Sequence, residues 1–373
     1  MSLPASERVD VSVLAGLFAN TTNSYKYLLF LALLDELERR YSSQEPADER
    51  IGLRDLAVGM LLNAWYPHVF FKLSFGVQDQ ISKILEQLST DVKFSFDRAG
   101  REKLRQHLQA RCGEEHIGTL LRYVVHRLQR GFFAADLRGC KDAVVDRMLQ
   151  SLARERFETT RPFYCAEPQG SEVIVHRDWV AYLRENLGIV RGWASWEWVR
   201  YMQSRNQHVP AIPDKLFAPR QRASLREQNL FWTRVLQTGP VHCIYSGVVL
   251  SPESIALDHF IPWSFVAHDG LWNLVPANPS ANSSKRDGVP DQSYLASFHA
   301  LQTHGLLVAR PLFGESEWQK ATEAYVADLR LPSELLWAQP LDRDRLSSSL
   351  WSAFSSTMPA LMSLATQLAS SQG

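Results

Sequence analysis

Acidic, imidazole, amide and cationic side chains gather in the stretch from Val241 to Pro290. The residues of these types with the most suggestive spacing are Asp258, His259, Asn273, Asn282, Lys285 and Arg286. Hydrolysis of a phosphodiester needs a base that takes a proton from water near neutral pH, and histidine is the side chain best suited to that task. A hard divalent cation neutralises charge developing on the phosphate and prefers oxygen ligands. The segment therefore indicates metal-assisted phosphodiester hydrolysis.

Three of these residues have an expected role in this chemistry. His259 is the predicted general base. The carboxylate of Asp258 and the side-chain oxygen of Asn282 are the predicted metal ligands, since a hard cation takes few protein oxygens and keeps water and substrate oxygens in its shell. Magnesium is the expected ion, with manganese as the alternative.

The order and spacing of these residues resemble a known family. Asp258-His259 is followed by an Ile-Pro-Trp-Ser turn, by Asn273-Leu274 about fourteen positions on, and by Asn-x-x-Lys ending at Lys285. This pattern resembles the HNH endonucleases, whose site is a ββα-metal fold. The spacing is especially similar to the HNH domain of the RNA-guided CRISPR effector nucleases, including the Asp-x-Val-Pro of 287–290. The resemblance covers about 50 of the 373 residues.

The resemblance implies an arrangement for the site. The strand expected over Ile255 to Trp263 would carry His259, and the helix expected to begin at Pro279 would carry Asn282 beneath it. Asn273 would brace the intervening loop and orient His259 without touching the metal. Lys285 and Arg286 would lie near the phosphate as positioned cations.

Many HNH proteins also hold a structural zinc ion with two Cys-x-x-Cys pairs. Here the first pair reads Cys243-Ile-Tyr-Ser and the second reads Asn278-Pro-Ser-Ala, so one of four ligands remains and no structural zinc is expected. Apolar packing must then hold the motif together. The side chains available for it are Ile244, Tyr245, Val248, Leu257, Ile261, Trp263, Trp272 and Leu274.

Charge is balanced over the whole chain but not along it. Lys+Arg and Asp+Glu both number 40, so any nucleic-acid footprint must be local. Eight basic against three acidic residues lie between Arg191 and Arg234. This excess predicts contacts to a nucleic-acid backbone, although a linker's charges are also often only solvated. The residues predicted to bind nucleic acid are Arg220, Arg222, Arg226 and Arg286.

A second basic stretch runs from Arg101 to Arg156, with twelve basic and seven acidic residues. Arg122, His126 and Arg130 recur every four residues, which would place them on one helix face. The two interpretations are a ridge that faces phosphates and, more commonly, a solvated helix face.

The chain is expected to be mainly α-helical. Residues 1–219 read as a helical module for recognition, sensing or a protein partner, 220–310 as the HNH domain, and 311–373 as a helical extension. The proline-rich stretch from Val209 to Arg222 cannot form a continuous helix, so the first boundary is placed near Pro219.

Composition also bears on location. The four cysteines have no paired spacing, which favours reduced thiols in the cytoplasm. The apolar run from Tyr27 to Leu34 is too short to span a membrane, and no signal peptide is expected.

These observations predict a magnesium-dependent endonuclease that acts on DNA, with a bacterial restriction or antiphage defence role suggested by association with the family. Three alternatives remain. The chain could bind nucleic acid without cutting it, could be a nuclease subunit that a partner or effector ligand activates through the helical module, or could cut RNA, because the chemistry does not need a deoxyribose.

Overall fold

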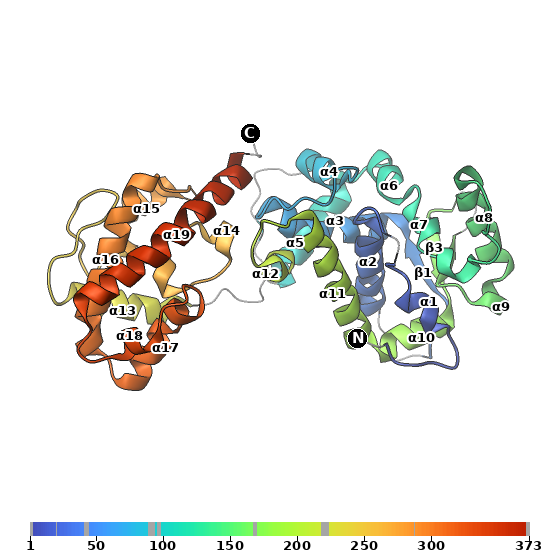
Figure 1. Ribbon diagram of the computed structural model, residues 1–373. Helices are drawn as coiled ribbons and strands as arrows, with labels where there is room; N and C mark the ends of the chain where they lie inside the picture. The colour runs from blue at the N-terminus through green and yellow to red at the C-terminus, as the bar shows by residue number, and fades with distance from the viewer. Residues whose placement is uncertain are drawn as a thin grey trace. The chain divides into compact units, whose positions relative to one another are not determined.

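The structure, a computed structural model, describes residues 3–19, 21–40, 45–88, 94, 98–166, 170–217, 224–286 and 288–370 (Figure 1). Helices dominate this part of the chain, and its strands form one three-stranded and one two-stranded sheet. The prediction of a mainly α-helical protein is therefore confirmed.

The chain divides into two compact units. Residues 1–207 with 212–221 form the first, and residues 208–211 with 222–373 form the second. The helices that follow residue 310 belong to the second unit together with the hairpin before them. Pro219, the predicted boundary, lies outside the described residues, and the division into three functional modules stays a prediction.

Two apolar helices form the centre of the first unit. Helix α2 (Tyr25–Arg39) packs on α3 (Leu53–Val69), and both are buried over most of their length. The two backbones approach closely at Gly59, where an added Cβ would lie 2.7 Å from the Cβ of Ala32. Further helices of this unit are α1 (Val11–Ala15), α4 (Ile81–Leu88), α5 (Arg98–Arg111), α6 (Glu114–Leu121), α8 (Asp142–Glu155), α9 (Phe157–Thr160), α10 (Arg177–Glu185), α11 (Leu187–Arg205) and α12 (Ile212–Leu216).

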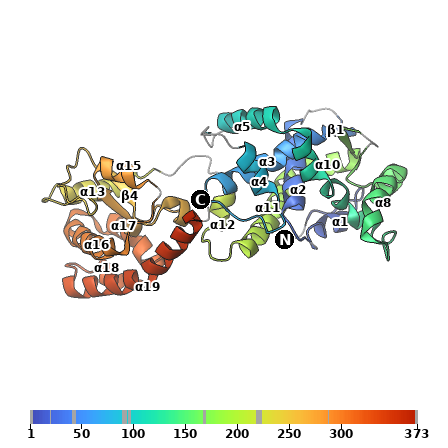
Figure 2. The same cartoon turned by 90° about the horizontal axis from the view of Figure 1, so that it is seen from above.

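A small antiparallel sheet completes this unit. Strand β3 (Glu172–Val175) lies between β1 (Glu49–Gly52) and β2 (Tyr164–Ala166). Its residues alternate between half-buried and buried, as in a strand with one face towards the core. Figure 2 shows the same elements from above.

The basic stretch after residue 101 does not form the continuous helix face that its spacing suggests. Helix α6 ends at Leu121, a separate short helix α7 covers Val124–Arg127, and Arg130 begins the 3₁₀ turn η1 (Arg130–Phe133). Each break rotates the following residues, so the four-residue spacing no longer places side chains on one face. A single phosphate-facing ridge on one helix is therefore wrong for this segment.

In the second unit, helices surround a β-hairpin. Strands β4 (Ala256–His259) and β5 (Leu274–Ala277) pair, and α15 (Pro279–Lys285) packs on β4. The buried indole of Trp232 donates a hydrogen bond to the carbonyl of Leu274 at 3.2 Å. The surrounding elements are α13 (Arg226–Leu236), α14 (Trp263–Val266), η2 (Leu271–Asn273), η3 (Gln292–Tyr294), α16 (Leu295–Ala309), η4 (Arg310–Leu312), α17 (Glu315–Ala327), α18 (Ser333–Trp337) and α19 (Arg343–Ser370).

One close approach fixes two of these helices. A Cβ at Gly305 of α16 would lie 2.7 Å from the ring of Trp232 on α13, so glycine is needed where the indole crosses the helix. The same indole holds β5, and the hairpin is thereby tied to two helices that come before and after it in the chain. In the described part of the chain, no helix combines the length and apolar character needed to cross a membrane.

Candidate active site

The hairpin positions the residues predicted to do chemistry. In its register Asp258 faces Val275 and His259 faces Leu274, so His259 is the last residue of β4. The chain then leaves the sheet through α14 and returns to β5 through the turn η2. The expected strand, loop, strand and helix therefore occur in that order, with β4 shorter than the predicted strand from Ile255 to Trp263.

Asn273 lies fully buried beneath this loop. Its amide nitrogen donates to the carbonyl of Ile261 at 2.9 Å, and its side-chain oxygen accepts from the N–H of Ile261 at 2.8 Å. Its own carbonyl accepts from the N–H of Phe260 at 2.8 Å. Three hydrogen bonds thus fix the two residues that follow His259, an arrangement suited to the bracing role expected of this asparagine.

His259 has a carboxylate partner that the sequence analysis missed. Its Nε2 lies 2.8 Å from Oδ1 of Asp269, and both side chains are mostly buried. A carboxylate on one ring nitrogen sets the tautomer and orientation of the imidazole and leaves the other nitrogen able to accept a proton. The only signal in the sequence is an acidic residue in the connection between the two strands, and its spacing from His259 matches no helix or strand period.

Asp258 is buried, with 3% of its surface exposed. The phenol of Tyr245 donates to its Oδ2 at 2.5 Å, and Nζ of Lys285 lies 3.1 Å from its Oδ1. Burial raises the pKa of this carboxyl, and the charge of Lys285 and the Tyr245 hydrogen bond oppose that shift. Burial and the neighbouring Asp258 raise the pKa of Tyr245 further above its usual value, so the phenol remains a donor.

Lys285 joins the helix to the strand. Besides Asp258, its Nζ contacts the carbonyl of His259 at 2.7 Å, and its side chain is 10% exposed. Asn282 is half-buried and precedes Lys285 by three residues, so the two lie on the same face of α15. The face that reaches Asp258 therefore also presents the amide of Asn282.

The start of this helix is well defined by its sequence. Asn278 is the N-cap and accepts hydrogen bonds from the N–H groups of Ser280 and Ala281, while Pro279 occupies the first turn. The helix ends where Arg286 takes a left-handed φ of 51°. Arg286 is exposed, and Asp287 lies outside the described residues.

A hydrogen bond links the two segments that correspond to the cysteine pairs of zinc-bearing HNH proteins. The N–H of Asn278 lies 3.4 Å from Sγ of Cys243, and a turn closes behind that thiol with Gly247 at φ 70°. Burial would raise the pKa of the Cys243 thiol, but hydrogen bonds from Asn278, Ser246 and Tyr245 together lower it. Among the described residues, no three His, Cys, Asp or Glu side chains gather to hold a metal ion.

Apolar packing around the motif includes most of the predicted side chains, with Ile244, Tyr245 and Leu257 partly buried against the core and Trp263 half-buried. Ile261, Trp272 and Leu274 are buried, but Val248 is 51% exposed and adds nothing to the core. It directly follows Gly247, whose φ of 70° closes the turn after Cys243.

The predicted nucleic-acid contacts are only partly described. Arg226, at the first position of α13, and Arg286 are exposed, while Arg220 and Arg222 lie outside the described residues. Several other basic residues of the same stretch have acidic partners within the fold. The ion pairs are Arg191 with Asp35 and Glu38, Arg200 with Glu197, and Arg234 with Glu317. The charge available to a nucleic acid is therefore smaller than the simple count.

The donor set suits a hard divalent cation. A buried carboxylate at Asp258 favours a positive charge beside it, and a bound ion would share this carboxylate with the Lys285 ammonium. Asp258 and Asn282 offer oxygen donors, and a magnesium ion bound by so few protein groups keeps water and substrate oxygens as its other ligands. The residues present therefore fit such an ion.

Comparison with known proteins agrees with this geometry. The model of a family described as HNH endonuclease matches residues 243–291. The match includes the Cys243 turn, the hairpin and α15, and with them Asp258, His259, Asn273, Asn282 and Lys285. No curated protein and no solved structure matches the chain. Residues 243–291 are therefore an HNH endonuclease segment, a kind of segment that acts on nucleic acid and generally uses a divalent metal ion, within a mainly helical chain.

Proposed function

We propose that this protein is a magnesium-dependent endonuclease that hydrolyses phosphodiester bonds in DNA. The observation that carries the proposal is the contact between His259 and Asp269. His259 is the last residue of its strand, and the residue just before it is the buried Asp258. An oriented imidazole next to a carboxylate able to hold a cation supplies both a base for the attacking water and a charge to stabilise the phosphate.

His259 is the general base of this reaction. With Nε2–H donating to Asp269, the proton from the attacking water passes to Nδ1. Asp269 stabilises the imidazolium that forms and holds the ring in place. Asn273 fixes the backbone just after His259, so the ring is held by its side-chain partner and by its backbone together.

Asp258 and Asn282 would hold the metal ion. When bound, the ion neutralises the charge that develops on the phosphate and the leaving oxygen. Lys285 keeps the Asp258 carboxylate and the carbonyl of His259 in one arrangement, and its charge favours an anionic substrate at the same place. Exposed Arg226 and Arg286 are proposed to contact the phosphate backbone.

DNA is the proposed substrate, in keeping with the resemblance to DNA-cutting HNH enzymes, and a bacterial defence role in the cytoplasm is proposed on the same ground. The helical module of residues 1–219 is proposed to supply recognition, a sensor or a partner contact. Nothing in the arrangement of His259 and Asp258 depends on a deoxyribose, so RNA is the substrate to compare directly.

The test is digestion of supercoiled plasmid, linear DNA and RNA by the purified full chain, with magnesium or with EDTA. Cleavage is expected with magnesium alone and is expected to fall about 10²–10⁴-fold in His259→Ala. His242→Ala is the matched control, because that histidine is exposed and its described contacts are backbone pairing to Val249.

Cleavage that survives His259→Ala would contradict the assigned base. Tight binding of DNA without cutting under any of these conditions would replace the proposal with a non-catalytic binding role. Activity that appears only after addition of a co-purified protein would instead assign the chain to a partner-activated nuclease.

A further inference from the structure

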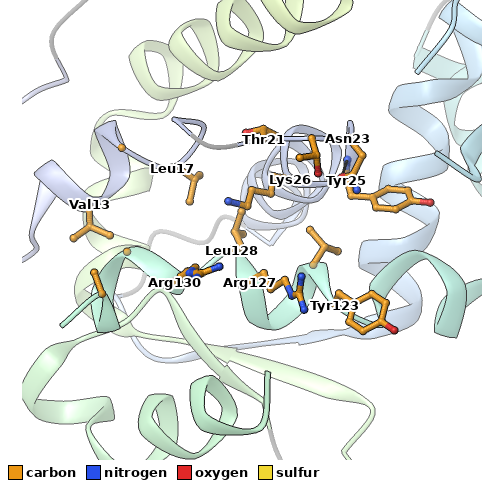
Figure 3. A pocket seen from close by; sticks show the side chains of 15 residues that line it. Val13, Leu17, Thr21, Asn23, Tyr25, Lys26, Tyr123, Arg127, Leu128 and Arg130 are labelled. Atoms are coloured by element: carbon orange, nitrogen blue, oxygen red, sulfur yellow. Dashed lines mark hydrogen bonds between the residues drawn. The ribbon is translucent and has the colours of Figure 1, made fainter. Parts of the chain in front are cut away.

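The first unit contains a pocket of about 670 Å³. Its walls come from α1, the start of α2, and the segment from α7 to η1 (Figure 3). A volume between about 300 and 1,000 Å³ is usual for sites that bind small molecules. The pocket therefore has the dimensions of a ligand site, in the unit that does not hold the HNH segment.

Three cations line this pocket, namely Lys26, Arg127 and Arg130, and no acidic residue is among the 15 described residues around it. Arg127 is neutralised from outside the pocket by Asp142 at 3.0 Å and Asp146 at 2.8 Å. Lys26 and Arg130 have no ion pair with any described residue. Two positive charges therefore face the cavity without a carboxylate to balance them.

These cations lie close enough to repel one another. Burial lowers the pKa of Lys26, and the charges of Arg130 and Arg127 lower it further. In Figure 3 the Lys26 and Arg130 side chains reach into the space between α2 and η1 from opposite sides. An anion placed there would replace the repulsion with two charge-assisted hydrogen bonds.

The remainder of the pocket is largely apolar. Val13 and Leu17 line it on the α1 side, and Val124 and Leu128 line it from the segment that follows Tyr123. Tyr123 lies at the edge with 49% of its surface exposed. A flat organic ring would cover such an apolar wall, whereas inorganic phosphate alone would leave the wall exposed to water.

We propose that this pocket binds a small organic phosphate of the nucleotide class, with its phosphate at Lys26 and Arg130 and its ring against the apolar wall. The charges match, because a phosphate monoester carries about −1.5 to −2 at neutral pH and the two unpaired cations carry two positive charges. The polar side chains of Thr22 and Asn23 at the same pocket are placed to bind hydroxyl groups.

The experiment is isothermal titration of the full chain with AMP, GMP, CMP and UMP, with the four nucleosides, and with inorganic phosphate. At least one nucleotide is expected to bind, with its nucleoside and phosphate each about tenfold weaker or more. Lys26→Gln and Arg130→Gln should each weaken nucleotide binding about tenfold. Arg138→Gln is the matched control, since this exposed arginine of the same stretch does not line the pocket.

Thermal unfolding of each variant separates loss of the site from loss of the fold. Lys26→Gln removes a repelled, half-buried charge and Arg130→Gln changes an exposed one, so neither should lower Tm. Equal binding of phosphate and nucleotide would overturn the ligand class. Unchanged binding in both variants, or no nucleotide binding below the millimolar range, would overturn the site. Titrations repeated with His259→Ala are expected to give the same Kd, so this result does not depend on nuclease activity.

Discussion

At the scale of single residues, the site depends on how each reactive side chain is held. His259 has Asp269 on Nε2, and Asp258 has Tyr245 and Lys285 on its two oxygens. In a solvated loop these side chains would rotate freely about their bonds. Such freedom lowers the rate of catalysis, because the reactive groups are then seldom in the right orientation. The partners, more than the reactive residues, are what the structure adds to the motif.

Asp269→Asn is expected to lower kcat about tenfold to a hundredfold while KM for DNA changes less than about twofold. The reason is that Asp269 contacts the proposed base and would not contact the substrate. Steady-state cleavage with magnesium measures both constants, and Asp269→Glu should recover part of kcat. A rise in KM with kcat unchanged would show that Asp269 serves substrate binding.

At the scale of elements, two asparagines have different roles in the hairpin and α15. Asn273 is buried and satisfies both backbone groups of Ile261, whereas Asn282 is half-buried and has no side-chain hydrogen bond to any described residue. Removal of the first leaves a buried donor and a buried acceptor unpaired, and removal of the second leaves neither. The two residues should therefore separate stability from activity.

Asn273→Ala is expected to destabilise the second unit by about 2–6 kcal/mol, because it leaves two buried groups unpaired and each costs about 1–3 kcal/mol. Asn282→Ala should leave the free energy of unfolding within about 0.5 kcal/mol of the original and should still abolish most magnesium-dependent cleavage. Urea unfolding followed by tryptophan fluorescence measures the free energy of unfolding of both variants. Plasmid nicking measures the magnesium-dependent cleavage. Normal stability in Asn273→Ala would contradict the bracing role.

At the scale of the whole molecule, the charge distribution decides how nucleic acid is bound. The formal net charge is +0, and Arg234 in the unit that holds the site is paired with Glu317. A neutral protein has no long-range attraction for a polyanion, so binding depends on the few exposed cations near the hairpin. Affinity for DNA should therefore be modest and should depend on a small number of phosphate contacts.

Arg226→Gln and Arg286→Gln are each expected to reduce the slope of log K against log salt concentration by about 0.9, the value for one phosphate contact on duplex DNA. Fluorescence anisotropy with a labelled duplex in EDTA measures the slope without cleavage. Arg138→Gln serves as the control of equal charge change in the first unit. Slopes that do not change in either variant would place the DNA contacts elsewhere.

The sequence by itself determined the HNH resemblance of residues 243–291, the mainly helical class, and the order of the strand, loop and helix that carry Asp258, His259, Asn273, Asn282 and Lys285. These features depend on residue type and on spacing along the chain, so they can be seen without a fold. The helix start at Pro279 is visible for the same reason.

Tertiary structure decided the rest. Asp269 reaches His259, Tyr245 reaches Asp258, and the α1 segment meets residues more than a hundred positions later to form the cationic pocket. Because the chain breaks between α6, α7 and η1, Arg130 lines that pocket and does not lie on a helix ridge with Arg122. The spacing of residue types along the sequence does not indicate such contacts. They arise when separate elements bury their apolar faces against one another and bring distant side chains together.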